Sequence, residues 1–250
     1  MKERRIAILR WQSGQVPEGL MQLGNLRGNS TNPESYPFPV EMVEVPGANL
    51  DSVILHPSKT LLDNMIRQVK RLEADGVAAV STSCGFNAVF QEALADAVDI
   101  PVFTSSLLQV PFAQRIIGGS HAVAIITANG EALSPRHLAA CGITDEMNTV
   151  IVGLEHTKEW SKLFNDPTAK FDMEALTDEI LSTVRGQLAR NPEIRAIVLE
   201  CTDLPPYAEQ MRREFHLPVF DINSLIGHMA MALSLHHLYE PEVLPRTSRG

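Results

Sequence analysis

The sequence contains an internal repeat in which the second half of the chain follows the first at an offset of 117 residues. Matching positions at this offset include residues 7–9 with 124–126, Cys84 with Cys201, and residues 101–103 with 218–220. A single offset that aligns hydrophobic runs, a cysteine and a proline indicates duplication of a structural unit. The chain is therefore expected to fold into two similar units.

Within each unit, short runs rich in β-branched residues alternate with helical patterns, as is typical of parallel α/β folds. The expected strands of the first unit are residues 5–11, 40–45, 77–81 and 101–103. Residues 60–75 have a helical pattern, and we expect Thr60 with Asp63 to cap this helix and Gly76 to end it. The predicted fold class is α/β, with two lobes related by pseudo-two-fold symmetry. Each lobe is a parallel sheet flanked by helices, and the active site lies between them.

The repeat also predicts the domain boundaries. Residues 1–118 form the first lobe and residues 119–224 the second. A last helix over residues 225–238 is expected to cross back, so that residues 225–250 belong to the first lobe and 241–250 form a frayed tail. The first unit has an additional segment, residues 12–39, rich in Gly, Asn, Ser and Pro, which is a candidate lid over the cleft.

Composition limits the partners of the chain. The formal net charge is −9, and Lys and Arg are scattered, so nucleic acid is not an expected partner. No run approaches the roughly 18 apolar residues of a membrane span, so no membrane is expected. Three widely spaced cysteines do not indicate a disulfide framework, which favours a cytoplasmic location. The histidines show no metal-binding spacing and no nucleotide-binding motif occurs, so neither a metal nor a nucleotide cofactor is expected.

Cys84 and Cys201 each follow a predicted hydrophobic strand and precede a helical pattern. Ligands of open parallel sheets collect at the carboxyl ends of strands, where helix N-termini bind carboxylates and lower thiol pKa values. One thiolate can then remove a proton from one face of a carbon while the other thiol protonates the opposite face. Two like groups in one site titrate as a coupled pair, which favours one thiolate and one thiol. Cys141 is expected to be a buried hydrophobic residue.

The residues around Cys201 resemble a known motif. Residues 200–205 read Glu-Cys-Thr-Asp-Leu-Pro. This stretch resembles the second catalytic motif of the aspartate/glutamate racemase superfamily (Asp/Glu/hydantoin racemase family), commonly Gly-Cys-Thr-Glu-Leu-Pro in aspartate racemases. Gln12 and Ser13 stand where glutamate racemases have Asp-Ser. The resemblance implies two similar α/β lobes, racemisation by two cysteines without a cofactor such as pyridoxal phosphate, and a homodimer.

The first motif departs from that pattern. Racemases of this kind usually follow the first cysteine with Asn-Thr, which binds the substrate carboxylate, whereas this chain has Gly85, Phe86 and Asn87. Gly85 allows close backbone approach, Phe86 offers an apolar wall, and Asn87 is expected to supply the missing amide. The predicted substrate-binding residues are Gln12, Ser13, Thr82, Gly85, Phe86, Asn87, Thr127, Thr202 and Asp203.

Two of these residues have a second interpretation. Thr127 and Asp203 follow predicted strands, where hydroxyl and carboxyl side chains also cap helices. In the functional interpretation, Thr127 donates a hydrogen bond where charge develops, and Asp203 orients Cys201 or accepts a substrate ammonium group. Both interpretations stay open at this point.

Together these features predict an isomerase, namely a cofactor-independent racemase or epimerase of a small carboxylate such as aspartate or glutamate. Cys84 and Cys201 are its predicted catalysts. An enzymatic alternative is maleate-isomerase or arylmalonate-decarboxylase chemistry on the same scaffold, although decarboxylases of this fold use one cysteine in the second half, which Cys84 argues against. An alternative of another class is a non-enzymatic two-lobed ligand-binding protein, which would not need thiols at both strand ends.

Overall fold

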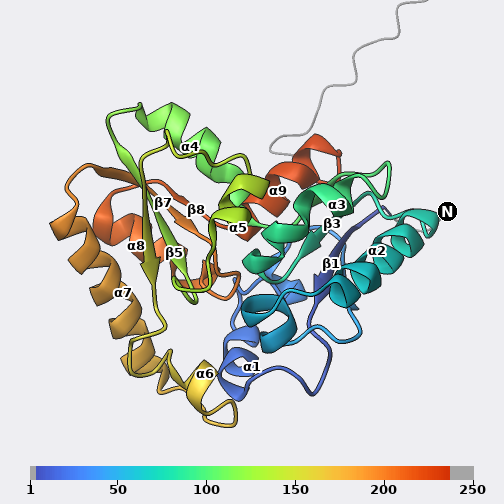
Figure 1. The fold of residues 1–250 in the computed structure, drawn as a ribbon, viewed down its shortest axis with the longest axis horizontal. Helices are drawn as coiled ribbons and strands as arrows, with labels where there is room; N and C mark the ends of the chain where they lie inside the picture. The colour runs from blue at the N-terminus through green and yellow to red at the C-terminus, as the bar shows by residue number, and fades with distance from the viewer. Residues whose placement is uncertain (1–3, 237–250) are drawn as a thin grey trace, which may run out of the picture.

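A computed structural model describes residues 4–236 of the chain. It contains two four-stranded parallel sheets flanked by helices, with strand orders β2-β1-β3-β4 and β6-β5-β7-β8 (Figure 1). The predicted α/β fold with two similar lobes is therefore confirmed. The strands are β1 (Ile6–Arg10), β2 (Val40–Glu44), β3 (Ala79–Thr82), β4 (Val102–Phe103), β5 (Ala122–Thr127), β6 (Thr149–Gly153), β7 (Ile194–Leu199) and β8 (Val219–Phe220).

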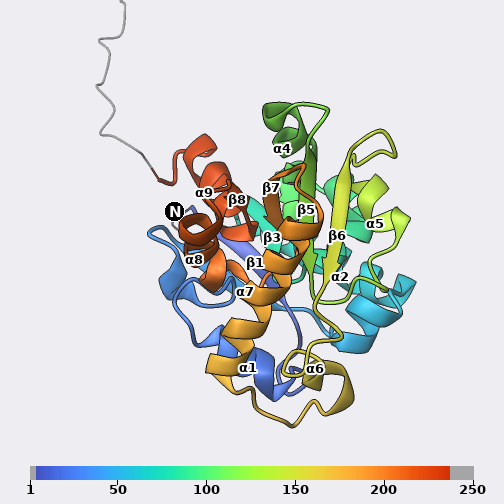
Figure 2. The ribbon, with the colours of Figure 1, turned by 90° about the vertical axis from the view of Figure 1, so that its left-hand side faces the viewer.

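The helices cover the outer sides of the two sheets, and α7 runs along the face of the second sheet that Figure 2 turns toward the viewer. The α-helices are α1 (Glu18–Gly24), α2 (Lys59–Ala74), α3 (Gln91–Ala95), α4 (Val110–Ile117), α5 (Pro135–Ala140), α6 (Lys162–Asn165), α7 (Met173–Arg190), α8 (Pro205–Phe215) and α9 (Ile222–Ala232). Short helices of other types are η1 (Pro33–Ser35), η2 (Asp51–Leu55), η3 (Gly85–Phe90) and η4 (Ser106–Gln109).

Strand register confirms the internal repeat. Two strand pairings keep the same register at the 117-residue offset: Ile8–Ser81 and Val80–Val102 in the first sheet, and Ile125–Val198 and Ile197–Val219 in the second. The pairings of β1 with β2 and of β5 with β6 do not follow this offset, because residues 12–39 lengthen the connection in the first lobe.

The N-cap of helix α2 lies two residues before the predicted one. Ser58 has the extended backbone of an N-cap, and its hydroxyl accepts a hydrogen bond from the Leu61 N–H at 3.2 Å. Thr60 is already inside the helix, so the predicted cap of Thr60 with Asp63 is wrong. Gly76 follows the helix with a φ of +79°, a conformation that suits glycine, so its predicted role at the helix end is confirmed.

The last described helix, α9, packs against the first sheet. Its residues Ile222, Ile226 and Ala230 form one buried cluster with Ile6 and Ile8 of β1. This contact supports the return of the chain to the first lobe, while the boundary at residue 118 stays a prediction. The helix ends at Ala232 rather than at residue 238, since the chain turns at residue 234 with a φ of 58°. The predicted tail, residues 241–250, lies outside the described residues.

The segment of residues 12–39 contains α1 and bridges the two lobes. The Glu18 N–H donates to the Pro167 carbonyl at 2.9 Å. The Gln22 side chain exchanges hydrogen bonds of 2.6 and 3.3 Å with the backbone of Phe171. Gly19 lies directly on the Phe171 ring, because a Cβ at this position would lie 2.6 Å from it. The segment thus spans the lobes, and its movement as a lid stays a prediction.

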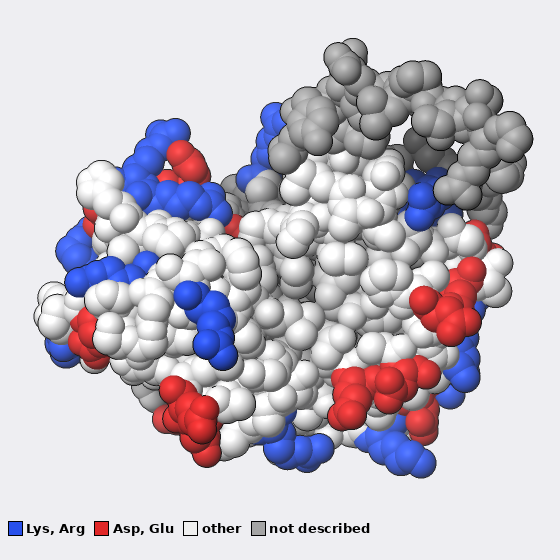
Figure 3. Space-filling model, turned by 90° about the horizontal axis from the view of Figure 1, so that it is seen from above, with Lys and Arg blue, Asp and Glu red and all other residues white. Residues whose placement is uncertain are grey.

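The surface carries both signs of charge. On the face shown in Figure 3, Lys and Arg side chains alternate with Asp and Glu, and no basic stripe runs across it. Among the helices of residues 4–236, none is both long and apolar enough to span a membrane.

Candidate active site

A cavity of about 550 Å³ is lined by both Cys84 and Cys201. Cys84 follows β3 and Cys201 follows β7, which are equivalent strands of the two sheets. The two residues are only 8% and 7% exposed, so the cavity is their main contact with solvent. The remaining walls come from residues 10–34, Leu50, Ile54, Phe86 and the second lobe, and include Trp11, Ala128, Trp160, Leu163 and Phe164.

The chain after each cysteine differs from the predicted α-helix. Cys84 is the N-cap of η3, a 3-10 helix, and Cys201 is followed by a turn, with α8 beginning only at Pro205. Neither thiol lies in the first turn of an α-helix, where the dipole acts most strongly. The expected lowering of the thiol pKa by an α-helix N-terminus is therefore wrong.

Burial and nearby carboxyls instead raise the pKa of both thiols well above the usual range. For Cys84 burial is the largest cause and Glu200 the next, and for Cys201 burial is followed by Asp203 and Glu200. One backbone N–H opposes this effect at each sulfur, from Phe86 at Cys84 and from Asp203 at Cys201. The protonated form of each thiol is thus favoured, and forming a thiolate at either position costs free energy.

The two cysteine motifs touch each other across the lobe interface. The Thr202 hydroxyl donates to the Ser83 carbonyl at 2.5 Å. A Cβ on Gly85 would lie 2.2 Å from the carbonyl oxygen of Glu200, so the backbones meet at a distance that no side chain at position 85 would permit. These contacts fix the positions of the two thiols relative to each other.

Two acids accompany the cysteines, Glu200 fully buried and Asp203 partly buried. Burial raises the pKa of Glu200 to about 8, and the Thr127 hydroxyl, which donates to its Oε2 at 2.7 Å, opposes the shift. Asp203 lines the cavity, where burial raises its pKa to about 6 against a 2.8 Å hydrogen bond from the Asn29 amide. Among the lining residues described, Arg10 alone is basic, and it forms a 2.7 Å ion pair with Glu44.

Replacing Asn29 by Ala is expected to raise the pKa of Asp203 further above its usual value. Burial then acts on the carboxyl without the opposing hydrogen bond, and loss of that bond favours the neutral form. Carboxyl ¹³C NMR across a pH series measures the change. Gln22→Ala, in the same segment but bonded to Phe171, is the matched control. An Asp203 pKa that is equal in Asn29→Ala and wild type would contradict this prediction.

The structure brings some predicted substrate-binding residues to the cavity and not others. Ser13, Phe86, Thr202 and Asp203 line it together with both cysteines. Gln12, Thr82, Gly85, Asn87 and Thr127 do not line it.

Internal hydrogen bonds hold three of these residues, Gln12, Thr82 and Thr127. The Gln12 Oε1 accepts from the Gly47 N–H at 2.8 Å, and the Thr82 hydroxyl donates to the Thr104 carbonyl at 2.6 Å. Thr127 donates to Glu200, as described above, rather than capping a helix. Asn87 is 4% exposed within η3, and its Oδ1 has no partner among the described residues.

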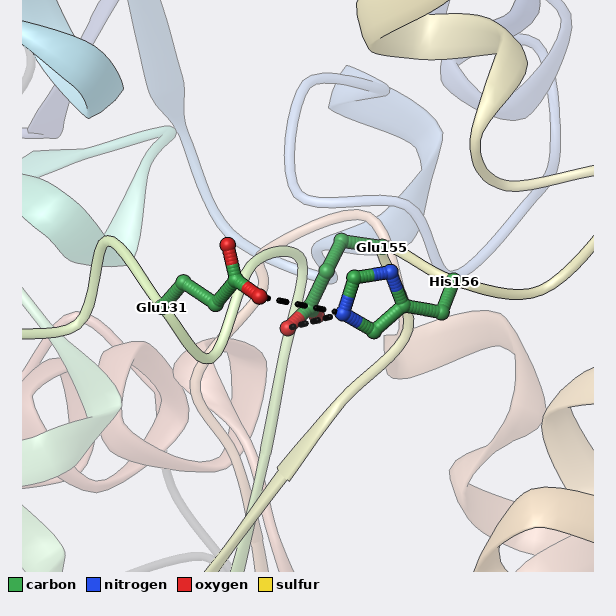
Figure 4. Close-up of side chains that lie close together, drawn as sticks. All are labelled: Glu131, Glu155 and His156. Atoms are coloured by element: carbon green, nitrogen blue, oxygen red, sulfur yellow. Dashed lines mark hydrogen bonds and ion pairs between the residues drawn. The ribbon is translucent and has the colours of Figure 1, made fainter.

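A separate cluster lies at two loops of the second lobe, outside this cavity (Figure 4). His156 Nε2 lies 3.2 Å from Glu131 and 3.9 Å from Glu155, and the three possible ligand atoms lie within 4.8 Å of one another. Sequence spacing does not reveal this arrangement, because the loops follow different strands. Glu131 and His156 are mostly exposed, so the cluster lies at the surface.

The chain matches the model of the Asp/Glu/hydantoin racemase family over residues 54–230, which is more than half of its length. The chain belongs to the Asp/Glu/hydantoin racemase family. This racemase-family chain is 32% identical over 207 residues to dimethylsulfoniopropionate lyase 7 of Emiliania huxleyi (strain CCMP1516). The match covers 78% of the chain and 59% of that relative, so the chain spans well under two thirds of the relative's length.

Solved structures of other proteins show the same fold. Allantoin racemase from Klebsiella pneumoniae has a TM-score of 0.59 at 14% identity, covering 98% of this chain and 97% of its own. Arylmalonate decarboxylase has a TM-score of 0.54 at 20% identity, covering 92% of each chain. The matched family and the similar proteins named above are enzymes: a lyase, a racemase and a decarboxylase.

Sequence reasoning missed the aromatic wall of this racemase-family site. Trp11 and Trp160 both line the cavity. Trp160 Nε1 donates to the Ala128 carbonyl at 3.0 Å, whereas Trp11 Nε1 is buried and has no partner among the described residues. Trp11 directly follows β1, so its strand-end position was a usable signal. Trp160 lies in an irregular loop, and no local pattern points to it.

Proposed function

We propose that this protein removes the proton α to the carboxylate of a small substrate, with Cys84 and Cys201 as its acid/base residues and no cofactor. The observation that carries the proposal is that two buried thiols from equivalent strand ends line one cavity. A positioned base contributes about 10²–10⁴-fold to such proton transfers. The buried indole N–H of Trp11 is a donor available to the carboxylate, whose negative charge grows as the proton leaves.

The cavity favours a carboxylate that also carries a cationic apolar group. Trp11, Phe86, Trp160 and Phe164 line it, and aromatic faces attract sulfonium and quaternary ammonium cations. Asp203, at the same cavity, supplies a carboxyl that balances a positive charge when ionised. Identity of 32% to a dimethylsulfoniopropionate lyase supports a substrate of this class.

The reaction we propose first is therefore β-elimination of dimethylsulfoniopropionate. A cysteine thiolate takes the α-proton, and the electron pair of that C–H bond becomes the second bond between the α- and β-carbons. The bond from the β-carbon to sulfur breaks, and its electrons leave with dimethyl sulfide. Acrylate remains, and the protonated cysteine returns its proton to water. One thiolate suffices as the base, and the second thiol can donate a hydrogen bond to the substrate.

Racemisation of an amino acid such as aspartate or glutamate is the second candidate. It is favoured by the equivalent placement of Cys84 and Cys201, because a second thiol at the matching strand end suits proton delivery to the opposite face. Here the α-carbon loses one proton and gains another, and no bond to a leaving group breaks.

One experiment separates these candidates. The protein is incubated in deuterated water with dimethylsulfoniopropionate and, separately, with each enantiomer of aspartate and glutamate. Gas chromatography measures dimethyl sulfide, proton NMR measures acrylate and α-deuteration, and optical rotation follows racemisation. Release of dimethyl sulfide with equimolar acrylate is the expected result. Deuteration with loss of optical rotation and no dimethyl sulfide would favour racemisation, and absence of every product would overturn the proposal.

Replacing Trp11 by Leu is expected to raise KM for dimethylsulfoniopropionate by about tenfold, with a smaller change in kcat. The change removes a cation–π face worth about 1–2 kcal/mol when desolvated, together with the buried N–H donor. Phe112→Leu, at an aromatic residue that is 58% exposed and outside the cavity, is the control. Steady-state kinetics check the effect, and equal KM values in the two variants would contradict it.

A further inference from the structure

Glu200 is a fully buried carboxyl that lies where the two cysteine motifs meet. It directly precedes Cys201, and its side chain lies against Gly85, the residue after Cys84. A Cβ on Gly85 would lie 2.3 Å from Glu200 Oε1. The missing side chain at position 85 therefore makes room for the carboxyl. In the racemase motifs that this chain resembles, an asparagine follows the first cysteine and a glycine precedes the second. This chain instead has Gly85 after Cys84 and Glu200 before Cys201, and the Glu200 carboxyl lies against Gly85 from the other lobe.

The hydrogen bonds of Glu200 suit a protonated carboxyl. Oε2 accepts from Thr127, and Oε1 is buried with no hydrogen-bond partner. Within residues 4–236, no ion pair to Glu200 is formed. Burying a carboxylate with one hydrogen bond and no cation is costly, whereas the neutral acid avoids that cost.

Among residues 4–236, each titratable group whose pKa Glu200 shifts becomes negative when it ionises. These groups are the thiols of Cys84 at the start of η3, Cys141 at the end of α5, and Cys201 after β7. Glu200 raises the pKa of each of these thiols. Asp203 follows Cys201 in the same turn and acts on both cavity thiols in the same direction. A negative charge on Glu200 therefore opposes a thiolate at either catalytic position.

We propose that Glu200 is a positioning residue that controls ionisation of the cysteine pair, allowing one thiolate when it is protonated and suppressing both when it is ionised. Burial raises the pKa of Glu200 to about 8, which places this change just above neutral pH. The catalytic consequence rests on the proposed function, whereas the coupling between Glu200 and the thiols does not.

Site-resolved alkylation tests the coupling without any substrate. Wild type and Glu200→Gln, which keeps the size and can still accept from Thr127, react briefly with iodoacetamide between about pH 6 and pH 10. Mass spectrometry then quantifies modified Cys84 and Cys201. We expect equal rates near pH 6 and about tenfold faster alkylation of the variant near pH 9, which corresponds to one pKa unit. The control is Glu41→Gln, a change on β2 at a carboxyl that pairs with Arg5. Identical pH profiles for wild type and Glu200→Gln would overturn the proposal.

Urea unfolding across pH gives a second, independent test. The folded pKa of Glu200, about 8, lies above its ordinary value of 4.5, so its stabilising contribution is fully present below 4.5 and is lost as pH rises through about 8. The unfolding midpoint of wild type should therefore fall relative to that of Glu200→Gln over this range. A constant difference would contradict the proposal.

A second variant serves if Glu200→Gln does not fold. Thr127→Val removes the hydrogen bond that lowers the pKa of Glu200, and so should move the alkaline suppression of alkylation to higher pH. If alkylation is suppressed at the same pH in Thr127→Val as in wild type, the proposal is overturned. If alkylation behaves as expected while neither dimethylsulfoniopropionate nor an amino acid reacts, the proposed function fails and the role of Glu200 stands.

Discussion

Replacing Cys201 by Ala lowers kcat/KM for α-proton removal by about 10²–10⁴-fold, the range that a positioned general base contributes. Cys84→Ala has an effect of this size if both thiols transfer protons. In β-elimination only the base is indispensable, so one of the two variants keeps a substantial part of the activity. In racemisation each enantiomer needs both thiols, so both variants lose turnover. Steady-state rates of the two variants thus also distinguish the two candidate reactions.

The matched control for these variants is Cys141→Ala. Cys141 is 4% exposed at the end of α5 and does not line the cavity, so it serves as a small buried hydrophobic residue, as the sequence predicted. Its replacement is expected to lower stability slightly and to leave kcat/KM near wild type. Wild-type kcat/KM in both Cys84→Ala and Cys201→Ala would exclude the proposed chemistry.

Gly85→Ala is expected to destabilise the protein by about 3 kcal/mol or more, at or above the upper end of the usual cost of overpacking. The new Cβ would lie 2.2 Å from the carbonyl oxygen of Glu200 and 2.3 Å from its Oε1. Turning the Glu200 side chain away relieves only the second contact, because the first involves backbone. The two lobes must then move apart at Gly85 and Glu200, next to the two cysteines. Activity is therefore expected to fall as well.

Urea unfolding monitored by far-UV circular dichroism measures this loss of stability. Gly119→Ala is the control, since a Cβ at Gly119 meets no atom within 4 Å, and surface changes of this kind shift stability by about 0.5 kcal/mol or less. Equal unfolding free energies for the two variants would show that the lobes do not meet at Gly85 as closely as described.

The sequence was sufficient to predict the two lobes and the placement of both cysteines at one cavity. Hydrophobic runs and their spacing are local signals. The repeat adds long-range information, because equivalent strands of the two parallel sheets carry equivalent residues at their ends. It therefore predicts that Cys84 and Cys201 occupy equivalent positions. The matching register of β1 with β3 and of β5 with β7 shows why the offset of 117 residues was informative.

The details of the site were less predictable, because they depend on contacts between the lobes. Thr127 was expected at the substrate, yet it donates to Glu200, whose carboxyl lies against Gly85 of the first lobe. The predicted lowering of the thiol pKa values was wrong for a related reason. The sequence showed helical patterns after both cysteines. It did not show that Cys201 stands before a turn, between the buried Glu200 and the partly buried Asp203.

The most direct test of the proposed function is release of dimethyl sulfide from dimethylsulfoniopropionate, measured by gas chromatography with wild type and with the Cys84→Ala, Cys201→Ala double variant. We expect wild type to release dimethyl sulfide and acrylate in equal amounts and the double variant to release neither above the uncatalysed rate. Equal release by both proteins, or no release by wild type together with no α-carbon exchange in aspartate or glutamate, would contradict the assignment of the cysteine pair as the catalyst of α-proton removal.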